Sequence, residues 1–326
     1  MASSCIIAPT VNVSEGTGVT QAPWNGSASF ANHGHIISTV LILTSVLGVP
    51  LNGLALWVLG CKVRRRNRFA VYVLNLVSAD FLFLALQAVH SACVFSSVDT
   101  SNPALLVFRC LIVACNVASA YLLTWISVER FFGVAFPIWW RLSHVRASAT
   151  LASCSIWALS LGMGALYGVI RGTSIAREGL VAAEFTLAFV IPLVAFSLAN
   201  VFILCNPGQP SRKTTKLYRA ITLNAVFFLM CWAPYHISVF LYYRAMADRL
   251  ISRCFSAFYG AYYSICLLHI KSCVVPLVYI SVSSELKIHF RQSLPNIFER
   301  RFSEESGLSS PQPPAGENGS CLAREP

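Results

Sequence analysis

The chain has 326 residues, of which 56% are hydrophobic and only 11% charged, and its mean hydropathy is +0.64. Because soluble domains carry about 25% charged residues, this composition excludes an ordinary soluble protein and indicates an integral membrane protein. The formal net charge of +11 would favour nucleic-acid binding in a soluble chain. In a membrane protein the positive-inside bias accounts for it, and we expect no nucleic-acid partner.

Residues 1–34 are expected to form an extracellular, glycosylated tail. They lack the basic segment and the continuous apolar stretch of a cleavable signal peptide, so the first span must act as its own insertion signal. Asn12 and Asn25 each begin an Asn-X-Ser triplet that accepts N-linked glycans. The same triplet at Asn318 is interpreted as a chance match in the cytoplasmic tail.

Seven apolar segments are long enough to cross a bilayer, which takes about 20 residues. The loops between them are short, so we expect an all-α fold with one seven-transmembrane helix bundle and no inserted soluble domain. The predicted spans are residues 35–60, 69–93, 103–132, 147–170, 181–205, 217–243 and 254–281.

The charges of the loops predict the orientation of the bundle. The loops after spans one, three and five carry ten Lys or Arg, whereas those after spans four and six carry five. The amino-terminal tail and the loop at 94–102 have none. Since Lys and Arg gather in cytoplasmic loops, we expect the amino terminus outside and the carboxyl terminus inside.

The bundle domain is expected to cover residues 35–294. Residues 285–294 mix apolar and basic side chains in the pattern of a short helix on the inner membrane surface. Residues 295–326 are rich in Ser, Pro and Glu and are predicted to be a disordered cytoplasmic tail. Its phosphorylation candidates, which follow two arginines or stand near glutamates, are Ser303, Ser306, Ser309 and Ser310.

Polar and kink-forming residues recur inside the spans. Asp80 is a carboxylate deep in an apolar helix, which by default marks a functional site with a partner. Ser119 lies about three turns from Arg130 on the same face of span three. Taken singly, such residues are also typical of helix packing. The others, in chain order, are Asn52, Asn75, Trp157, Cys231-Trp232-Ala-Pro234 and Pro276-Leu-Val-Tyr279.

Span three ends in Glu129-Arg130-Phe and is followed by Pro137-Ile-Trp-Trp-Arg141. By itself this end is also compatible with an Arg that reaches lipid headgroups beside an aromatic belt. Together with the polar residues of the other spans, in this order, it resembles the rhodopsin-like (class A) G-protein-coupled receptors. The resemblance covers residues 36–294.

This resemblance implies a plasma-membrane receptor that binds an extracellular ligand and activates heterotrimeric G proteins. It implies arrestin and membrane lipid as further partners, and neither a cofactor nor a metal. Glu129 would hold Arg130 in the inactive state and Arg130 would meet the G protein, with Tyr279 as a third member of this coupling switch. The implied activation core is Asp80, Ser119, Trp232, Pro234, Lys271 and Pro276.

Within that class the chain resembles the Mas-related receptors. The similarity lies in RFAVYVLNLVSADFLFL at 68–84, in the PIWWR exit from span three and in IWALSL at 156–161. Trp232 is a departure, because Mas-related receptors usually lack this Trp. The sixth span and the carboxyl-terminal tail are more similar to chemoattractant receptors.

The extracellular disulfide and ligand pocket also depart from the family pattern. The loop at 171–180 has no Cys for the usual class A bridge. Cys5 and Cys254 are a possible alternative pair, and a free Cys5 is the other interpretation. The pocket candidates are Arg109, Tyr167, Arg171, Glu184, Tyr235 and His236, and the two arginines favour an anionic group on a peptide or small-molecule ligand.

Lys271 gives the most specific prediction. It stands where the family has a polar residue that helps to bind sodium, and Val275 replaces the Asn before Pro276. Because an unpaired ammonium inside a bundle is very expensive, we expect Lys271 to pair with Asp80 as a tethered cation. Deprotonation of Lys271 is the rival interpretation.

Three other functions would each require different features of the sequence. A transporter predicts inverted repeats, and the two halves of this chain show none. A retinal protein is rejected because the family's Schiff-base position is His269, and Lys271 lies about 200° further around the helix. A receptor-like protein that does not couple to G proteins remains an alternative because of Val275. No span pairs a nucleophile with a base, so we expect no enzyme activity.

Overall fold

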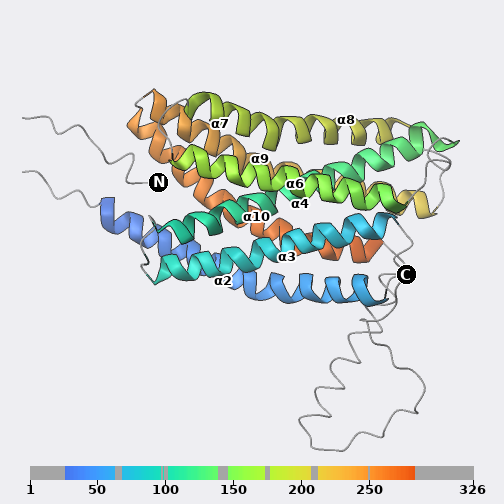
Figure 1. Ribbon diagram of the computed structural model, residues 1–326, viewed down its shortest axis with the longest axis horizontal. Helices are drawn as coiled ribbons and strands as arrows, with labels where there is room; N and C mark the ends of the chain where they lie inside the picture. Colours follow the sequence, from blue (N-terminus) through green and yellow to red (C-terminus); the bar gives the residue numbers. More distant parts are fainter. Residues whose placement is uncertain are drawn as a thin grey trace, which may run out of the picture.

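The computed structural model describes residues 26–62, 68–96, 98, 102–138, 146–172, 177–206, 212–248 and 250–282. These residues form a bundle of long antiparallel helices (Figure 1). The helices are α2 (Gly26–Trp57), α3 (Arg68–Phe95), α4 (Pro103–Ala135), α6 (Arg146–Gly172), α7 (Arg177–Phe185), α8 (Ile191–Cys205), α9 (Arg212–Ala247) and α10 (Ile251–Val282), with π-helical turns η1 (Val58–Lys62) and η2 (Thr186–Val190).

The predicted all-α, seven-span architecture is confirmed. In the described part of the chain, six helical segments are long and apolar enough to cross a membrane, and α9 supplies the seventh helix. The fifth crossing consists of α7, η2 and α8 in succession. The main difference lies at the start, because α2 begins at Gly26, inside the segment expected to be an amino-terminal tail. The surface helix expected at 285–294 lies outside the described residues.

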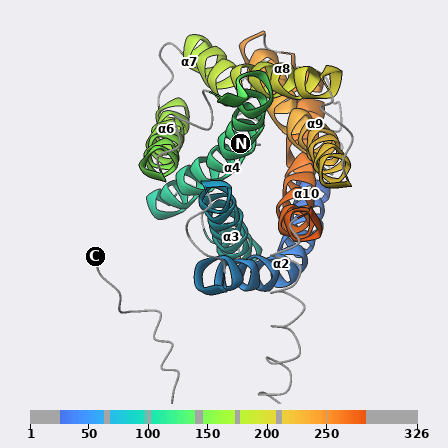
Figure 2. The same cartoon turned by 90° about the vertical axis from the view of Figure 1, so that its right-hand side faces the viewer.

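The bundle has two ends, which are named the Gly26 end and the Arg68 end after the first residues of α2 and α3. At the Gly26 end, on the left in Figure 1, α2, α4, α7 and α10 begin. At the Arg68 end, on the right, α3, α6 and α9 begin and α4 finishes. Seen along the bundle, the helices form a ring in which α6 lies outermost, against α4 (Figure 2). α10 packs against α9 and α2, and α3 lies between α2 and α4.

Glycines permit the closest helix contacts. A Cβ atom at Gly164 on α6 would lie 2.5 Å from the carbonyl oxygen of Cys110 on α4. A Cβ atom at Gly48 on α2 would lie 2.6 Å from both the sulfur of Cys273 and a methyl group of Leu84. Small residues at helix contacts are typical of membrane bundles, where backbones pack directly against each other.

The π-turn η2 has a local cause in Pro192. The N–H of Ile191 donates to the carbonyl of Thr186, five residues earlier. In that register the carbonyl of Leu187 would accept from residue 192, and proline has no N–H. The hydroxyl of Tyr121 on α4 donates to this carbonyl instead, at 2.5 Å. The turn is thus tied to α4 at the level where the aromatic side chains of the core meet.

Candidate functional site

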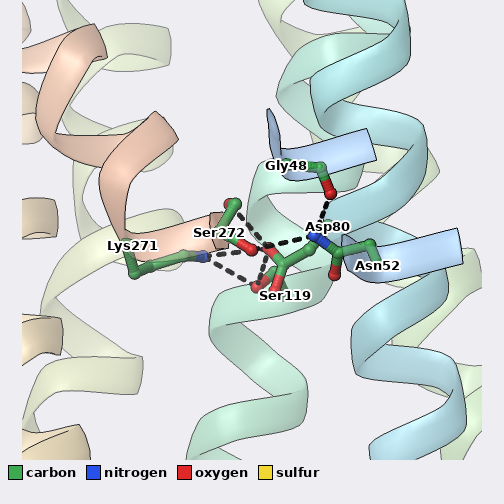
Figure 3. A network of polar contacts seen from close by, with 6 residues as sticks. All are labelled: Gly48, Asn52, Asp80, Ser119, Lys271 and Ser272. Atoms are coloured by element: carbon green, nitrogen blue, oxygen red, sulfur yellow. Dashed lines mark hydrogen bonds and ion pairs between the residues drawn. The ribbon is translucent and has the colours of Figure 1, made fainter. Parts of the chain in front are cut away.

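A buried polar network lies at the centre of the bundle (Figure 3). The carboxylate oxygen Oδ1 of Asp80 on α3 accepts hydrogen bonds from Ser119 on α4 at 2.9 Å and Ser272 on α10 at 2.8 Å. The Lys271 ammonium donates to Ser119 Oγ at 2.8 Å and lies 3.4 Å from Asp80 Oδ1. The Lys271 and Asp80 side chains are 2% and 1% exposed. The expected pair of Lys271 with Asp80 is therefore present.

Asn52 extends this network to a fourth helix. Its amide Nδ2 donates to the Gly48 carbonyl of its own helix at 2.9 Å and to the Ser272 carbonyl of α10 at 3.0 Å. The network thus joins α2, α3, α4 and α10 around one carboxylate. Ser272 was not among the residues predicted from the sequence, although its position beside Lys271 is a signal that could have drawn attention to it.

His269 lies near this network, in a position that the sequence did not predict to be functional. Its Nδ1 is 3.1 Å from the Thr44 hydroxyl on α2, and its ring makes an edge contact with Phe83 on α3. His269 is fully buried. This contact adds another polar link between α2 and α10.

Trp232 is completely buried beside an aromatic group on the fifth crossing. Its ring contacts Phe189 of η2 and His236 of its own helix, with centroids 5.7 and 4.7 Å away. Phe189 also stacks on His236 at 5.6 Å. Towards the Gly26 end, Phe185 stacks on Phe240 at 4.6 Å and contacts Phe189 at 5.2 Å. An unbroken column of aromatic rings therefore follows the contact between the fifth crossing and α9.

The predicted pocket residues gather at the Gly26 end of the bundle. Tyr167 of α6 lies within electrostatic range of Arg109, Arg171 and Glu184, which come from α4, α6 and α7. Tyr235 of α9 lies within range of Tyr167, Glu184 and Arg171. Tyr167 and Glu184 are buried, each 7% exposed. Two guanidinium groups, one carboxylate and several phenols therefore share this region.

Tyr243 is a further member of this pocket cluster that sequence reasoning missed. It is buried and lies within electrostatic range of Tyr167, Arg171 and Glu184. His236, one turn beyond Trp232, lies below the cluster and connects it to the aromatic column. By contrast, Arg244 pairs with Glu178 and Asp248 at 3.5 Å on an exposed rim, where ion pairs contribute little.

Glu129 and Arg130 lie at the Arg68 end, and both make contacts with α3. The Glu129 carboxylate accepts hydrogen bonds from Arg68 and Tyr72, both at 2.7 Å. The Arg130 guanidinium lies over the Phe69 ring, 4.5 Å from its centroid. The sequence predicts Arg130 as the close partner of Glu129 and gives no indication of Arg68 or Tyr72.

The other predicted residues lie in α9, in α10 or outside the described residues. Pro234 and Pro276 lie inside α9 and α10. Tyr279 lies on α10, but its side chain is outside the described residues. Cys254 is disulfide-bonded, whereas Cys5, one of the two interpretations of the sequence for its partner, lies outside the described residues. The same holds for Asn12, Asn25, Ser303, Ser306, Ser309 and Ser310. Among the described residues, no cluster of His, Cys, Asp or Glu could hold a metal ion.

Trp157 links the outermost helix to the centre. Its indole N–H on α6 donates to the Asn75 side-chain oxygen on α3 at 3.1 Å. Asn75 in turn donates to the Val71 carbonyl of its own helix at 2.9 Å. These two residues were noted in the sequence only as polar or aromatic positions within spans, and the structure pairs them.

Comparison with known proteins agrees with this architecture. Residues 51–179 match the 7 transmembrane receptor (rhodopsin family) model. The chain is 33% identical to mouse Mas-related G-protein coupled receptor member A1 over 261 residues, which is 76% of this chain and 83% of the relative. It is 28% identical to human member X1 over 293 residues, 87% and 89% of the two chains, and 31% identical to human member X2 over 75% and 76%.

The chain therefore belongs to the Mas-related G-protein-coupled receptors of the rhodopsin family. It is a multi-pass receptor of the plasma membrane, and its family is one of receptors rather than enzymes. A heterotrimeric G protein and an extracellular ligand are the partners that this family implies.

Proposed function

We propose that this receptor binds a ligand at the Gly26 end of the bundle and activates a G protein at the Arg68 end. The observation that carries the proposal is a series of contacts that leads from the Gly26 end into the core of the bundle. It runs from the pocket cluster through the aromatic column to Trp232, and the polar network lies at the centre of the same bundle. The Gly26 end faces the extracellular side, because the loops rich in Lys and Arg join the helices at the opposite end.

The pocket cluster supports a ligand with an anionic group. Arg109 lies inside a membrane span, where an arginine must have a partner or a polar cavity. Arg171, at the end of α6, lies within electrostatic range of the same tyrosine as Arg109. An anionic group between them would form charge-assisted hydrogen bonds. Glu184 disfavours a ligand that carries only negative charge, so a peptide or small molecule with both charges fits the cluster best.

Ligand binding would reach the other end by shifting the bundle between two packings. Glu184 and Phe185 are neighbours in α7, so a ligand at the cluster acts directly on the top of the aromatic column. Trp232 at the foot of the column lies two residues before Pro234, where the absent N–H weakens the helix. Movement of α9 about this point would change the packing of its Arg68 end, which lies at the same end of the bundle as Arg130.

Replacement of Arg130 tests the proposed function. In the family Arg130 meets the G protein, so Arg130→Ala should abolish nucleotide exchange while surface expression and ligand binding persist. Exchange would be measured on a panel of Gα subunits, without ligand and with a panel of peptides, amines and carboxylates. Arg253→Ala is the matched control, because Arg253 is an exposed arginine at the Gly26 end. An Arg130→Ala receptor that signals normally would refute the mechanism.

A receptor-like protein without G-protein coupling is the second candidate. Val275 is buried in α10 directly before Pro276, at the position where the family has an Asn. If the wild-type chain activates none of the Gα subunits under any condition, this candidate is favoured. A transporter is not supported by any contact described above.

The carboxyl-terminal tail is the proposed site of arrestin recruitment. Phosphates on Ser303, Ser306, Ser309 and Ser310 would each add about −1.5 to −2 charge. Such a charged tail would recruit arrestin once the receptor is active.

A further inference from the structure

Residues in the first turns of α3 bind the carboxylate of Glu129, the residue next to Arg130. The same oxygen of Glu129, Oε1, accepts a hydrogen bond from Arg68 Nη2 and another from the Tyr72 hydroxyl, both at 2.7 Å. Arg68 and Tyr72 are four residues apart, so they lie on one face of α3. The Arg68 and Glu129 side chains are each 13% exposed. Their ion pair is therefore shielded from water, unlike the exposed pairs of the Gly26 end.

Phe69, which lies between Arg68 and Tyr72 in the chain, contacts Arg130. The Arg130 guanidinium lies 4.5 Å from the Phe69 ring centroid, a distance at which a cation–π interaction is favourable. Adjacent residues of a helix point about 100° apart, so the Glu129 and Arg130 side chains leave α4 in different directions. Both side chains nevertheless contact α3. The Arg68 cation and the Tyr72 phenol bind Glu129, and the Phe69 ring faces Arg130.

Both bonds to α3 are made by the same carboxylate oxygen of Glu129. Each strong bond that Glu129 makes to α3 also fixes the direction of its side chain and draws its charge towards Arg68. Charge-assisted bonds of this length are among the strongest in proteins. The same carboxylate is then a weaker partner for Arg130 than it would be without Arg68.

We propose that Arg68 and Tyr72 are positioning residues of the coupling switch. They hold Glu129 against α3 and thereby loosen its hold on Arg130, so that the receptor needs less ligand energy to present Arg130 to the G protein. The inference rests on the proposed function, since it requires that Arg130 meets the G protein. The coupling switch then includes Arg68 and Tyr72 as two further residues. Removing the Arg68 cation beside Glu129 is expected to lower activation rather than raise it, because Glu129 then binds Arg130.

Ligand-free nucleotide exchange on the panel of Gα subunits tests this proposal, with all variants compared at equal surface expression. Arg68→Gln should lower exchange about tenfold, the factor expected for one charge-assisted hydrogen bond, because Glu129 then turns to Arg130. Arg68→Lys should retain most of the exchange, and Tyr72→Phe should lower it less than Arg68→Gln does. Glu129→Gln should raise exchange, and adding Arg68→Gln to it should cause no further change.

The double variant separates positioning from structure. A purely structural role of Arg68 predicts the same fall in exchange with and without Glu129→Gln, and that result would overturn the proposal. Arg253→Gln serves as the control for loss of an arginine. If Arg130→Ala abolishes exchange while Arg68→Gln leaves it unchanged, only this inference fails. If Arg130→Ala exchanges nucleotide as the wild type does, the proposed function fails and the inference with it.

Discussion

The pair of Lys271 and Asp80 gives the prediction with the largest expected effect. The two charged atoms are 3.4 Å apart, so their attraction is about 5 kcal/mol at an effective dielectric constant of 20. Desolvation of two buried ions offsets much of this attraction. Removal of one partner leaves a buried charge without its counter-ion and costs about 3–5 kcal/mol. Removal of both avoids that penalty.

A double-variant cycle measures this coupling. Lys271→Met and Asp80→Asn keep the approximate side-chain volumes, and each should lower surface expression and the thermal stability of the purified receptor by several degrees. The double variant should recover part of the loss, because neither charge remains buried. Thermal unfolding in detergent without ligand provides the measurement. Effects of the two substitutions that simply add would refute the argument.

Sodium gives an independent readout of the same pair. Because the Lys271 ammonium already donates to Ser119 and pairs with Asp80, the wild type should show no sodium-specific change in stability when sodium replaces choline at constant ionic strength. Lys271→Met should gain a sodium response, since Asp80, Ser119 and Ser272 then present oxygens without a cation. Marked sodium sensitivity of the wild type would contradict the tethered-cation interpretation.

Three further predictions concern other parts of the chain. Arg109→Ala should weaken an acidic agonist about tenfold or more, from the energy of a charge-assisted hydrogen bond, with Arg253→Ala as control; a cationic agonist that depends on Glu184 alone would overturn it. Truncation at Ser303 should reduce arrestin recruitment and internalisation in a cell-surface assay, and unchanged internalisation would count against a phosphorylated tail. Gly164→Val should sharply reduce the amount of folded receptor, because its Cβ would lie 2.5 Å from the Cys110 carbonyl oxygen. Gly162→Val should be tolerated, because a Cβ at that position meets no atom within 4 Å; surface expression of the two variants provides the comparison.

The seven spans could be predicted from the sequence because crossing a bilayer requires about 20 consecutive apolar residues, and this hydropathy is a local property of the sequence. The pairing of Lys271 with Asp80 could be predicted for a related reason. Burying a charge in an apolar helix is so costly that a deep cation requires a deep anion, and Asp80 was the only acid assigned to that depth. The high cost of an unpaired buried charge therefore predicted this pair without any knowledge of the helix contacts.

The partners of Glu129, by contrast, were decided by the tertiary structure. The sequence places Glu129 beside Arg130, but neighbours on a helix diverge, and the rotation of α3 against α4 brings Arg68 and Tyr72 to the carboxylate. The pocket residue Tyr243 and the serine at position 272 were missed for the same reason. Helical periodicity tells which residues share a face, whereas the facing residue on another helix depends on packing between segments far apart in the chain. The sequence by itself therefore determined the spans and the need for a buried pair, and only the packed bundle decided which side chains meet.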